Sequence, residues 1–154
     1  MISFDVRVER GLPLDPAVVA REIHATLSDK RSWRGTEHVR FRLVSDPAKA
    51  RLHAYVATPG TTDRLCYPWR TRGAVSCQIG NRVVLNAKRW VFGARAYKSD
   101  IAGYRQYLVN HEFGHSLGYN HVGCPGKGRP APVMMQQTKG LRGCRPNPWP
   151  SVAR

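Results

Sequence analysis

The chain has 154 residues, of which 42% are hydrophobic, and its formal net charge is +15. This length predicts one domain, residues 1–154, and the hydrophobic content excludes a largely disordered chain. No stretch approaches the roughly 18 apolar residues that a membrane-spanning helix requires. The first residues lack the basic and apolar regions of an export signal, so we expect no such signal within this sequence.

The positive charge is concentrated in residues 61–154, which hold 15 of the 25 lysines and arginines but only 3 of the 10 acidic residues. A field of this sign favours acidic substrates or other anionic partners, and a basic surface without a dedicated partner accounts for it equally well. Specific nucleic-acid binding is not expected, because no basic and aromatic stripe or recognition-helix pattern is present. We expect the protein to be a monomer.

The first half of the chain carries alternating strand and helix patterns. A period of two predicts a strand over 3–9. Asp15 and Pro16 are typical of a helix start, and the apolar periodicity after them predicts a helix that ends near Ser28. Two further strands are predicted, at 38–45 and 52–57. The polar segments between and after these elements have loop composition, at 30–37 and 61–73.

The second half is predicted to contain a hairpin and a long helix. Short strands at 75–78 and 82–86 flank Gly80-Asn81, and a helix capped by Asp100 is expected from 101 to about 117. Gly118 should end this helix in a left-handed conformation. No periodic segment follows. The predicted class is α+β, with a twisted mixed sheet, a helix near the N-terminus, a long later helix and a short irregular C-terminal part.

Four cysteines, Cys66, Cys77, Cys124 and Cys144, lack the C-x₂-C spacing of zinc knuckles and thioredoxin-like sites. Three disulfide pairings are possible, and nearest-neighbour pairing, Cys66–Cys77 with Cys124–Cys144, is the simplest. Each bridge of this kind stabilises a fold by roughly 3 kcal/mol and indicates an oxidising compartment. Four reduced thiols in a cytosolic protein are the alternative.

Residues 111–121 read His-Glu-Phe-Gly-His-Ser-Leu-Gly-Tyr-Asn-His, which is the pattern H-E-x-x-H-x-x-G-x-x-H. His111 and His115 are four residues apart on the predicted helix, so their imidazoles project from one face. Gly118 allows a sharp turn, after which His121 supplies a third nitrogen. Three protein ligands leave one position open, which predicts a catalytic rather than a structural Zn²⁺ site.

Glu112, next to the first histidine, is the predicted general base. Its carboxylate can take a proton from a water activated by zinc and pass it to the leaving amine of a cleaved peptide bond. The motif therefore predicts a zinc-dependent endopeptidase that forms no covalent intermediate. The remaining three histidines are expected to be ordinary surface or packed residues: His24, His38 and His53.

The eleven-residue motif resembles the signature of the metzincin zinc peptidases, in which a methionine turn follows. In Pro132-Val133-Met134-Met135-Gln136 the two methionines occupy the corresponding place, and Met134 is favoured because it follows Pro-Val. The resemblance implies a zincin-like fold with a methionine packed beneath the three histidines; two ordinary core methionines are the alternative. It also implies an edge strand that pairs with extended substrate, formed here by 74–79 or 82–86.

Residues 104–150 are also similar to a family of small, largely uncharacterised actinobacterial metzincin-like domains. This resemblance implies an extracellular or cell-surface location. A Cys124–Cys144 bridge would then tie the loop of the third histidine to the segment after the methionine turn. The matching segments are Tyr104-Arg105-Gln106-Tyr107, Val122-Gly123-Cys124-Pro125-Gly126, Gln136-Gln137-Thr138-Lys139-Gly140-Leu141 and Cys144-Arg145-Pro146-Asn147-Pro148-Trp149-Pro150.

The sequence differs from that of better-known metzincins just after the two methionines. Gln136 and Gln137 stand where some branches place a tyrosine, and either glutamine is a candidate hydrogen-bond partner for a substrate. The leading prediction remains an extracellular metallopeptidase that cleaves peptides or proteins, acidic ones in particular. The alternatives are a zinc hydrolase of cell-wall or modified peptides, a module that keeps zinc for structure, and a basic polyanion binder. Glu112 argues against a purely structural zinc, since such a site needs no carboxylate of this kind.

Overall fold

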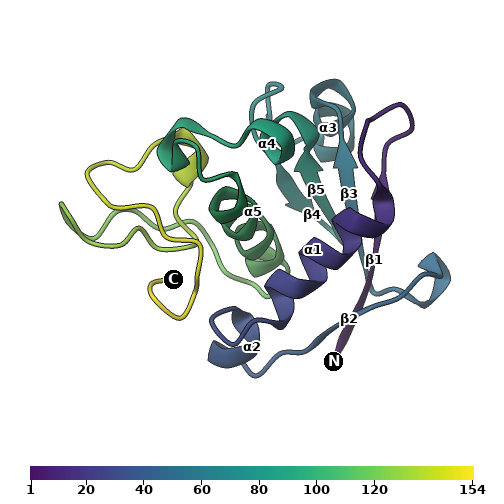
Figure 1. The fold of residues 1–154 in the computed structure, drawn as a ribbon, viewed down its shortest axis with the longest axis horizontal. Helices are drawn as coiled ribbons and strands as arrows, with labels where there is room; N and C mark the ends of the chain where they lie inside the picture. Colours follow the sequence, from purple (N-terminus) through teal and green to yellow (C-terminus); the bar gives the residue numbers. More distant parts are fainter.

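The computed structural model describes residues 1–154 and contains one five-stranded sheet (Figure 1). The strand order is β2-β1-β3-β5-β4, in which β4 is antiparallel to β5 and the other neighbours are parallel. The predicted α+β class with a mixed sheet is therefore confirmed. The strands are β1 (Ile2–Val8), β2 (Phe41–Leu43), β3 (Leu52–Ala57), β4 (Cys77–Ile79) and β5 (Arg82–Asn86).

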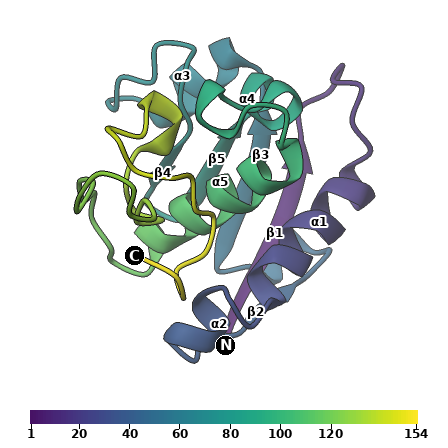
Figure 2. The same cartoon turned by 60° about the vertical axis from the view of Figure 1, so that its left-hand side comes forward.

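Two long helices, α1 (Pro16–Ser28) and α5 (Ile101–Ser116), cover one face of the sheet (Figure 1 and Figure 2). None of the helices is both long and apolar enough to cross a membrane. The shorter helices are α2 (Trp33–Thr36), α3 (Pro59–Cys66) and α4 (Ala87–Phe92), and single 3₁₀ turns occur at Pro47–Lys49, Arg95–Tyr97 and Gln137–Lys139.

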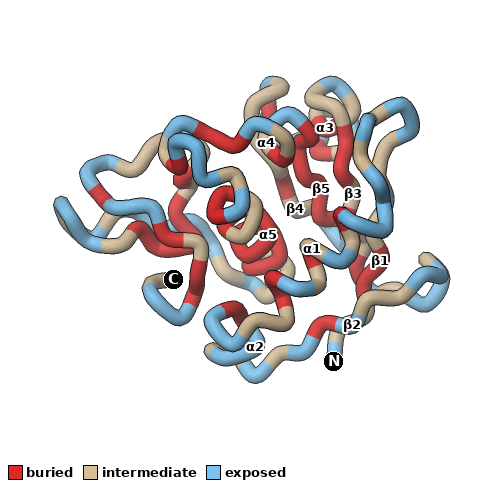
Figure 3. Tube along the Cα trace, in the orientation of Figure 1, coloured by how far each residue is buried: buried red, intermediate tan, exposed pale blue.

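The main core lies between the sheet and the two long helices. Phe113 of α5 meets Phe4 of β1 and Phe41 of β2 edge to face, with ring centroids 5.5 and 5.4 Å apart. Helix α1 buries 4 of its 13 residues, whereas α5 buries 10 of its 16. Helix α5 is buried on more than one side because it lies between the sheet and the C-terminal segment (Figure 3). Its side chains can therefore reach both the sheet edge and the C-terminal loops.

The strongly periodic elements agree with the sequence-based predictions. The strands predicted at 3–9 and 52–57, the helix after Asp15 and the hairpin around Gly80-Asn81 are all present, with ends within two residues of those expected. The side chain of Asp100 accepts a hydrogen bond from the backbone N–H of Gly103 and so caps α5. Gly118 follows α5 with a φ of +97°, as predicted.

Two predicted loops are wrong, because each contains a short helix. Segment 61–73 overlaps α3, which begins with Pro59 and is capped by the Thr58 side chain. Segment 30–37 contains α2, which is held by the fully buried side chain of Trp33. The predicted strand at 38–45 shortens to β2, and His38 is excluded from it by a φ of +56° that an extended strand does not allow.

Both disulfides pair nearest neighbours, as the simplest of the three possible patterns predicts. Cys66–Cys77 joins the end of α3 to edge strand β4. Cys124–Cys144 joins two parts of the C-terminal segment, and Cys144 packs with Met135 in a small apolar cluster there. This segment contains no helix beyond the turn at Gln137–Lys139, so the expected irregular C-terminal part is confirmed. The second disulfide thus stabilises a region that has little regular secondary structure.

Candidate metal centre

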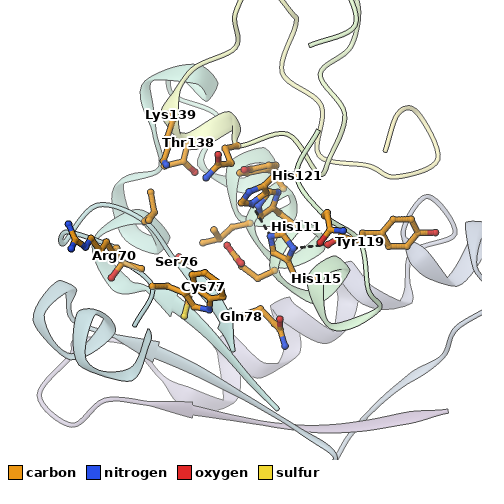
Figure 4. A pocket seen from close by; sticks show the side chains of 18 of the residues that line it. Arg70, Ser76, Cys77, Gln78, His111, His115, Tyr119, His121, Thr138 and Lys139 are labelled. Carbon is orange, nitrogen blue, oxygen red and sulfur yellow. Dashed lines mark hydrogen bonds between the residues drawn. The ribbon is translucent and has the colours of Figure 1, made fainter. Parts of the chain in front are cut away.

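The structure brings the three motif histidines together. Their candidate ligand nitrogens all lie within 4.8 Å of one another, and Nε2 of His115 is 3.0 Å from Nε2 of His121. His111 and His115 come from consecutive turns of α5, and His121 comes from the loop after Gly118. The three imidazoles face one another at the side of the cleft (Figure 4).

Backbone carbonyl groups fix two of the imidazoles. Nδ1 of His111 lies 2.8 Å from the carbonyl oxygen of Val133, and Nδ1 of His115 lies 2.8 Å from that of Tyr119. A carbonyl oxygen can only accept, so each Nδ1 carries the hydrogen and each Nε2 carries a free lone pair. This arrangement is typical of metal-binding histidines, which donate their second ring N–H to a neighbouring acceptor.

The donor set fits a divalent metal ion. Two nitrogens bound to zinc at about 2.05 Å in tetrahedral geometry lie roughly 3.3 Å apart, close to the separation between His115 and His121. At 3.0 Å, the lone pair on Nε2 of His115 repels any lone pair on Nε2 of His121 unless a hydrogen or a metal cation lies between the two atoms. Three imidazole nitrogens suit zinc and other first-row transition metals. The cluster of His111, His115 and His121 can therefore hold a metal ion.

The surroundings favour the neutral form of all three imidazoles, which is the form that binds a metal. Burial lowers the pKa of His111 to about 3, and the nearby His115 acts in the same direction. Burial also lowers the pKa values of His115 and His121. The three histidines outside the motif do not join the cluster. One of them, His53, instead bonds through Nδ1 to Asp5 at 2.5 Å.

Glu112 is the carboxylate that lines the same cleft. Its side chain is almost fully buried in α5 and makes no hydrogen bond or ion pair with another residue. Burial raises the pKa of this carboxyl group to about 8. A carboxyl group with such a pKa readily accepts and returns a proton near neutral pH, as general acid–base chemistry requires. The structure thus places a buried carboxyl group in the same cleft as the three histidines.

The cleft has a volume of about 460 Å³. Its floor is α5, and its walls are the loop Trp69–Thr71, the edge strand β4 with the two residues before it, the loop of His121, and the turn that ends at Lys139. Cys77 also lines it, so the first disulfide lies directly at the cleft (Figure 4). A cleft of this size accommodates a few residues of an extended peptide.

Only one of the two proposed edge segments is an edge. Strand β5 (Arg82–Asn86) lies between β3 and β4, so the alternative at 82–86 is wrong. Strand β4 forms the edge, and Ser76 precedes it along the same wall. The backbone N–H and C=O of Ser76 make no hydrogen bond within the protein. They are available to an extended chain that enters the cleft.

The two methionines lie in different surroundings. The backbone N–H of Met135 donates to Pro132 across a tight turn, with Met134 at its third position. Met134 is buried in the main core, and its sulfur lies against α5 at Gly114. Met135 instead packs beside Cys144 in the small C-terminal cluster. Met134 is therefore the methionine whose sulfur packs against the helix of His111, whereas Met135 bonds to that helix only through its carbonyl oxygen, which accepts from Tyr107.

Gly114 permits this contact because it has no side chain. A Cβ atom at position 114 would lie 2.6 Å from the sulfur of Met134 and 2.7 Å from a ring carbon of Trp33. We expect Gly114→Ala to destabilise the fold by about 1–3 kcal/mol, the usual cost of an overpacked core. Urea unfolding measures this. Gly60→Ala is the matched control, because Gly60 also lies in a helix but has open space around it. Equal stability of the two variants would contradict the prediction.

The loop of the third histidine is held by contacts that the sequence did not reveal. The Tyr119 ring stacks on Trp33, with centroids 4.7 Å apart. Its hydroxyl donates a hydrogen bond to Glu37, which also pairs with Arg154. The indole N–H of Trp33 in turn donates to the carbonyl oxygen of Asn110 in α5. Helix α2 thus connects the loop that carries His121 to the helix that carries the other two ligands.

Gln137 has a structural role, so its candidacy as a substrate contact is wrong. Its side chain is fully buried, accepts from the Tyr97 hydroxyl and the Asn147 N–H, and donates to the carbonyl oxygens of Pro132 and Asn147. These bonds hold the methionine turn against the C-terminal segment. The neighbouring Gln136 makes no side-chain hydrogen bond and lines the cleft.

Gln137→Met is expected to destabilise the protein by about 1–3 kcal/mol, because it leaves several buried donors and acceptors without partners. Gln136→Met makes the same chemical change at a half-exposed position without such bonds. Thermal unfolding should therefore show a clearly lower Tm for the first variant than for the second. If both variants have the same Tm as the wild type, the buried hydrogen-bond network contributes little to stability.

Comparison with curated proteins and with solved structures finds no significant match to either. One family model matches almost the whole chain, over residues 1–151. Its description is a protein of unknown function, DUF3152. The extent of the match shows that this chain belongs to the DUF3152 family.

Proposed function

We propose that this protein is a metzincin-type, zinc-dependent endopeptidase. The observation that carries the proposal is the convergence of three neutral imidazoles and one unpaired carboxyl group on a single cleft. Two of the imidazoles have their Nε2 lone pairs set by backbone carbonyls. A site that kept zinc only for structure would not need Glu112 beside it. The three-histidine set with an open fourth position is typical of catalytic zinc.

Each residue has a defined part in the proposed reaction. His111, His115 and His121 would hold a zinc ion, which would supply the Lewis acid that activates water and polarises the scissile carbonyl. Glu112 takes the proton from the attacking water and delivers it to the leaving nitrogen. The carbonyls of Val133 and Tyr119 keep two histidines oriented throughout. Ser76 offers its free backbone N–H and C=O to an extended substrate on the β4 side of the cleft.

The surroundings of the site also support an extracellular or cell-surface peptidase. Two disulfides, one of them at the cleft, favour an oxidising compartment. The sulfur of Met134 packs against α5 at Gly114. This contact keeps the turn that contains Val133 close to His111. These features give the site a rigid frame, which peptide hydrolysis by positioned groups requires.

The test is cleavage of a diverse peptide library by the zinc-loaded protein, analysed by mass spectrometry. Muropeptides are included as a second pool, so that a cell-wall peptide hydrolase is detected as well. We expect internal cleavage of linear peptides, which a chelator stops and added zinc restores. Binding of zinc without cleavage in either pool would refute the proposal.

A further inference from the structure

The charged side chains around the cleft are unevenly distributed. Arg70 stands on the wall formed by the loop after α3, and Lys139 stands on the wall formed by the last 3₁₀ turn. Figure 4 shows both at the end of the cleft away from Tyr119 and Gln78. Glu112 is the only acidic residue that lines the cleft, and it is buried in the floor. This end of the cleft therefore carries two positive charges and no exposed negative one.

Neither cation is neutralised within the protein. Arg31, Arg105 and Arg154 form ion pairs with acidic residues, whereas Arg70 and Lys139 make no ion pair and no side-chain hydrogen bond. Both side chains are exposed. Two free cations that line one cleft create a local field that attracts an anionic group of a ligand.

The wall that carries Arg70 is rigid. Asp63 accepts a hydrogen bond from the Thr71 hydroxyl at 2.5 Å and from the Gly73 N–H at 2.8 Å. The Cys66–Cys77 disulfide ties the start of the loop to β4, and the Trp69 N–H donates to Cys66. The backbone of Arg70 is thus held on both sides.

The wall that carries Lys139 is fixed as well. It belongs to the turn that starts at the fully buried Gln137, and Thr138 bonds to the Tyr104 hydroxyl at 2.9 Å. The backbone N–H of Lys139 donates to Gln136. Because both cations stand on fixed backbone, only the rotamers of these two exposed side chains have to be ordered when a ligand arrives. Such preorganisation increases the selectivity of a charged site.

From these features we infer that the end of the cleft between Arg70 and Lys139 binds a carboxylate of the substrate, so that the enzyme selects acidic peptides. This inference rests on the proposed peptidase function. The carboxylate has two possible sources, the side chain of an internal Asp or Glu and the free C-terminus of the peptide. Guanidinium and ammonium groups bind both kinds of carboxylate with charge-assisted hydrogen bonds.

The experiment uses matched sets of peptides that are blocked at the N-terminus. Within each set, one peptide has an internal Glu and an amidated end, one has Gln instead of Glu, and one has Gln with a free C-terminal carboxylate. Binding is measured by fluorescence anisotropy on the zinc-loaded Glu112→Gln variant, which is expected to turn the peptides over at least about 100-fold more slowly than the wild type. Cleavage of the same peptides by the wild type gives kcat/KM separately. The binding data therefore test the carboxylate site even where cleavage fails.

We expect one of the two carboxylate peptides to bind about tenfold more tightly than the neutral peptide at low salt, and the preference to fall as salt screens the charges. In the double variant Arg70→Gln with Lys139→Gln, the affinities for the carboxylate and neutral peptides should differ by no more than about twofold. The matched control is the double variant Arg72→Gln with Lys88→Gln, which changes two exposed cations outside the cleft. It should keep the roughly tenfold preference for the carboxylate peptide. Trp69, beside Arg70, is 60% exposed while the other tryptophans are buried, so its emission should change on binding.

The outcomes separate the two proposals. Equal binding of acidic and neutral peptides, or an equal loss in the control variant, overturns the carboxylate site even if the wild type cleaves peptides. The carboxylate site is supported if the preference for a carboxylate peptide is lost in the Arg70 and Lys139 double variant and kept in the control variant. If that preference is present but no peptide is cleaved, the peptidase proposal fails and the carboxylate site remains.

Discussion

Replacement of Glu112 by glutamine is expected to lower kcat for peptide hydrolysis by roughly 10²–10⁴-fold, the usual contribution of a positioned general base. Glutamine keeps the shape of the side chain but cannot take a proton. The histidines are untouched, so the zinc content of the purified protein should not change. Peptide cleavage and metal analysis on the same sample test both parts of this prediction.

Unfolding does not offer an alternative explanation for such a loss. Glu112 is buried without a polar partner, and burial raises its pKa to about 8. Its charged form is therefore disfavoured by the fold, and a neutral amide avoids this cost. Glu22→Gln is the matched control, because Glu22 of α1 pairs with Arg105 of α5 outside the cleft. More than a tenth of wild-type activity in the Glu112 variant would rule out this carboxylate as the base.

His121→Ala is expected to weaken zinc binding by at least about 100-fold, because even loss of a group that only orients a ligand costs 10- to 100-fold. Its Nε2 faces that of His115, and the side chain makes no other hydrogen bond. The variant should therefore fold normally. Competition with a coloured zinc chelator measures the affinity, and circular dichroism checks the fold.

The control for this change is another exposed histidine. His38 lies outside the cluster at a φ of +56°, a conformation that asparagine tolerates, so His38→Asn removes an imidazole without straining the backbone. We expect its zinc affinity to equal that of the wild type. Unchanged affinity in His121→Ala as well would mean that the metal binds elsewhere.

In zinc-loaded wild type, a chelator should also lower the Tm, since a metal that binds only the folded state stabilises it.

Local sequence signals predicted the elements that carry the site. The spacing of His111 and His115, the cap at Asp100 and the break at Gly118 are all local features, and the structure agrees with each of them. Helix α3 was missed although Thr58 and Pro59 are a normal cap and first residue, because the Pro-Gly pair also suits a turn. In that case the local signals were ambiguous rather than absent.

Other features depend on partners far away in the chain. Helix α2 has four residues, and its Trp33 is held by Asn110 and Tyr119, 77 or more residues further on. No local pattern in 30–37 indicates this contact. The burial of Gln137 is similar, since its partners Tyr97 and Asn147 are distant and its neighbour Gln136 looks identical in the sequence. Long-range polar contacts of this kind become visible only in three dimensions.

The acceptor that orients His111 belongs to the backbone of Val133, and this has a consequence for how the site can evolve. Where a side chain supplies such an acceptor, one substitution removes it. Here every residue type at position 133 offers the same carbonyl oxygen, so the imidazole keeps its orientation as long as the chain follows the same path. The hydrogen bond to His111 should therefore persist in any substitution at Val133 that the buried core accommodates, whereas changes at Gly114 and Gln137 disturb the packing and hydrogen bonds that set that path.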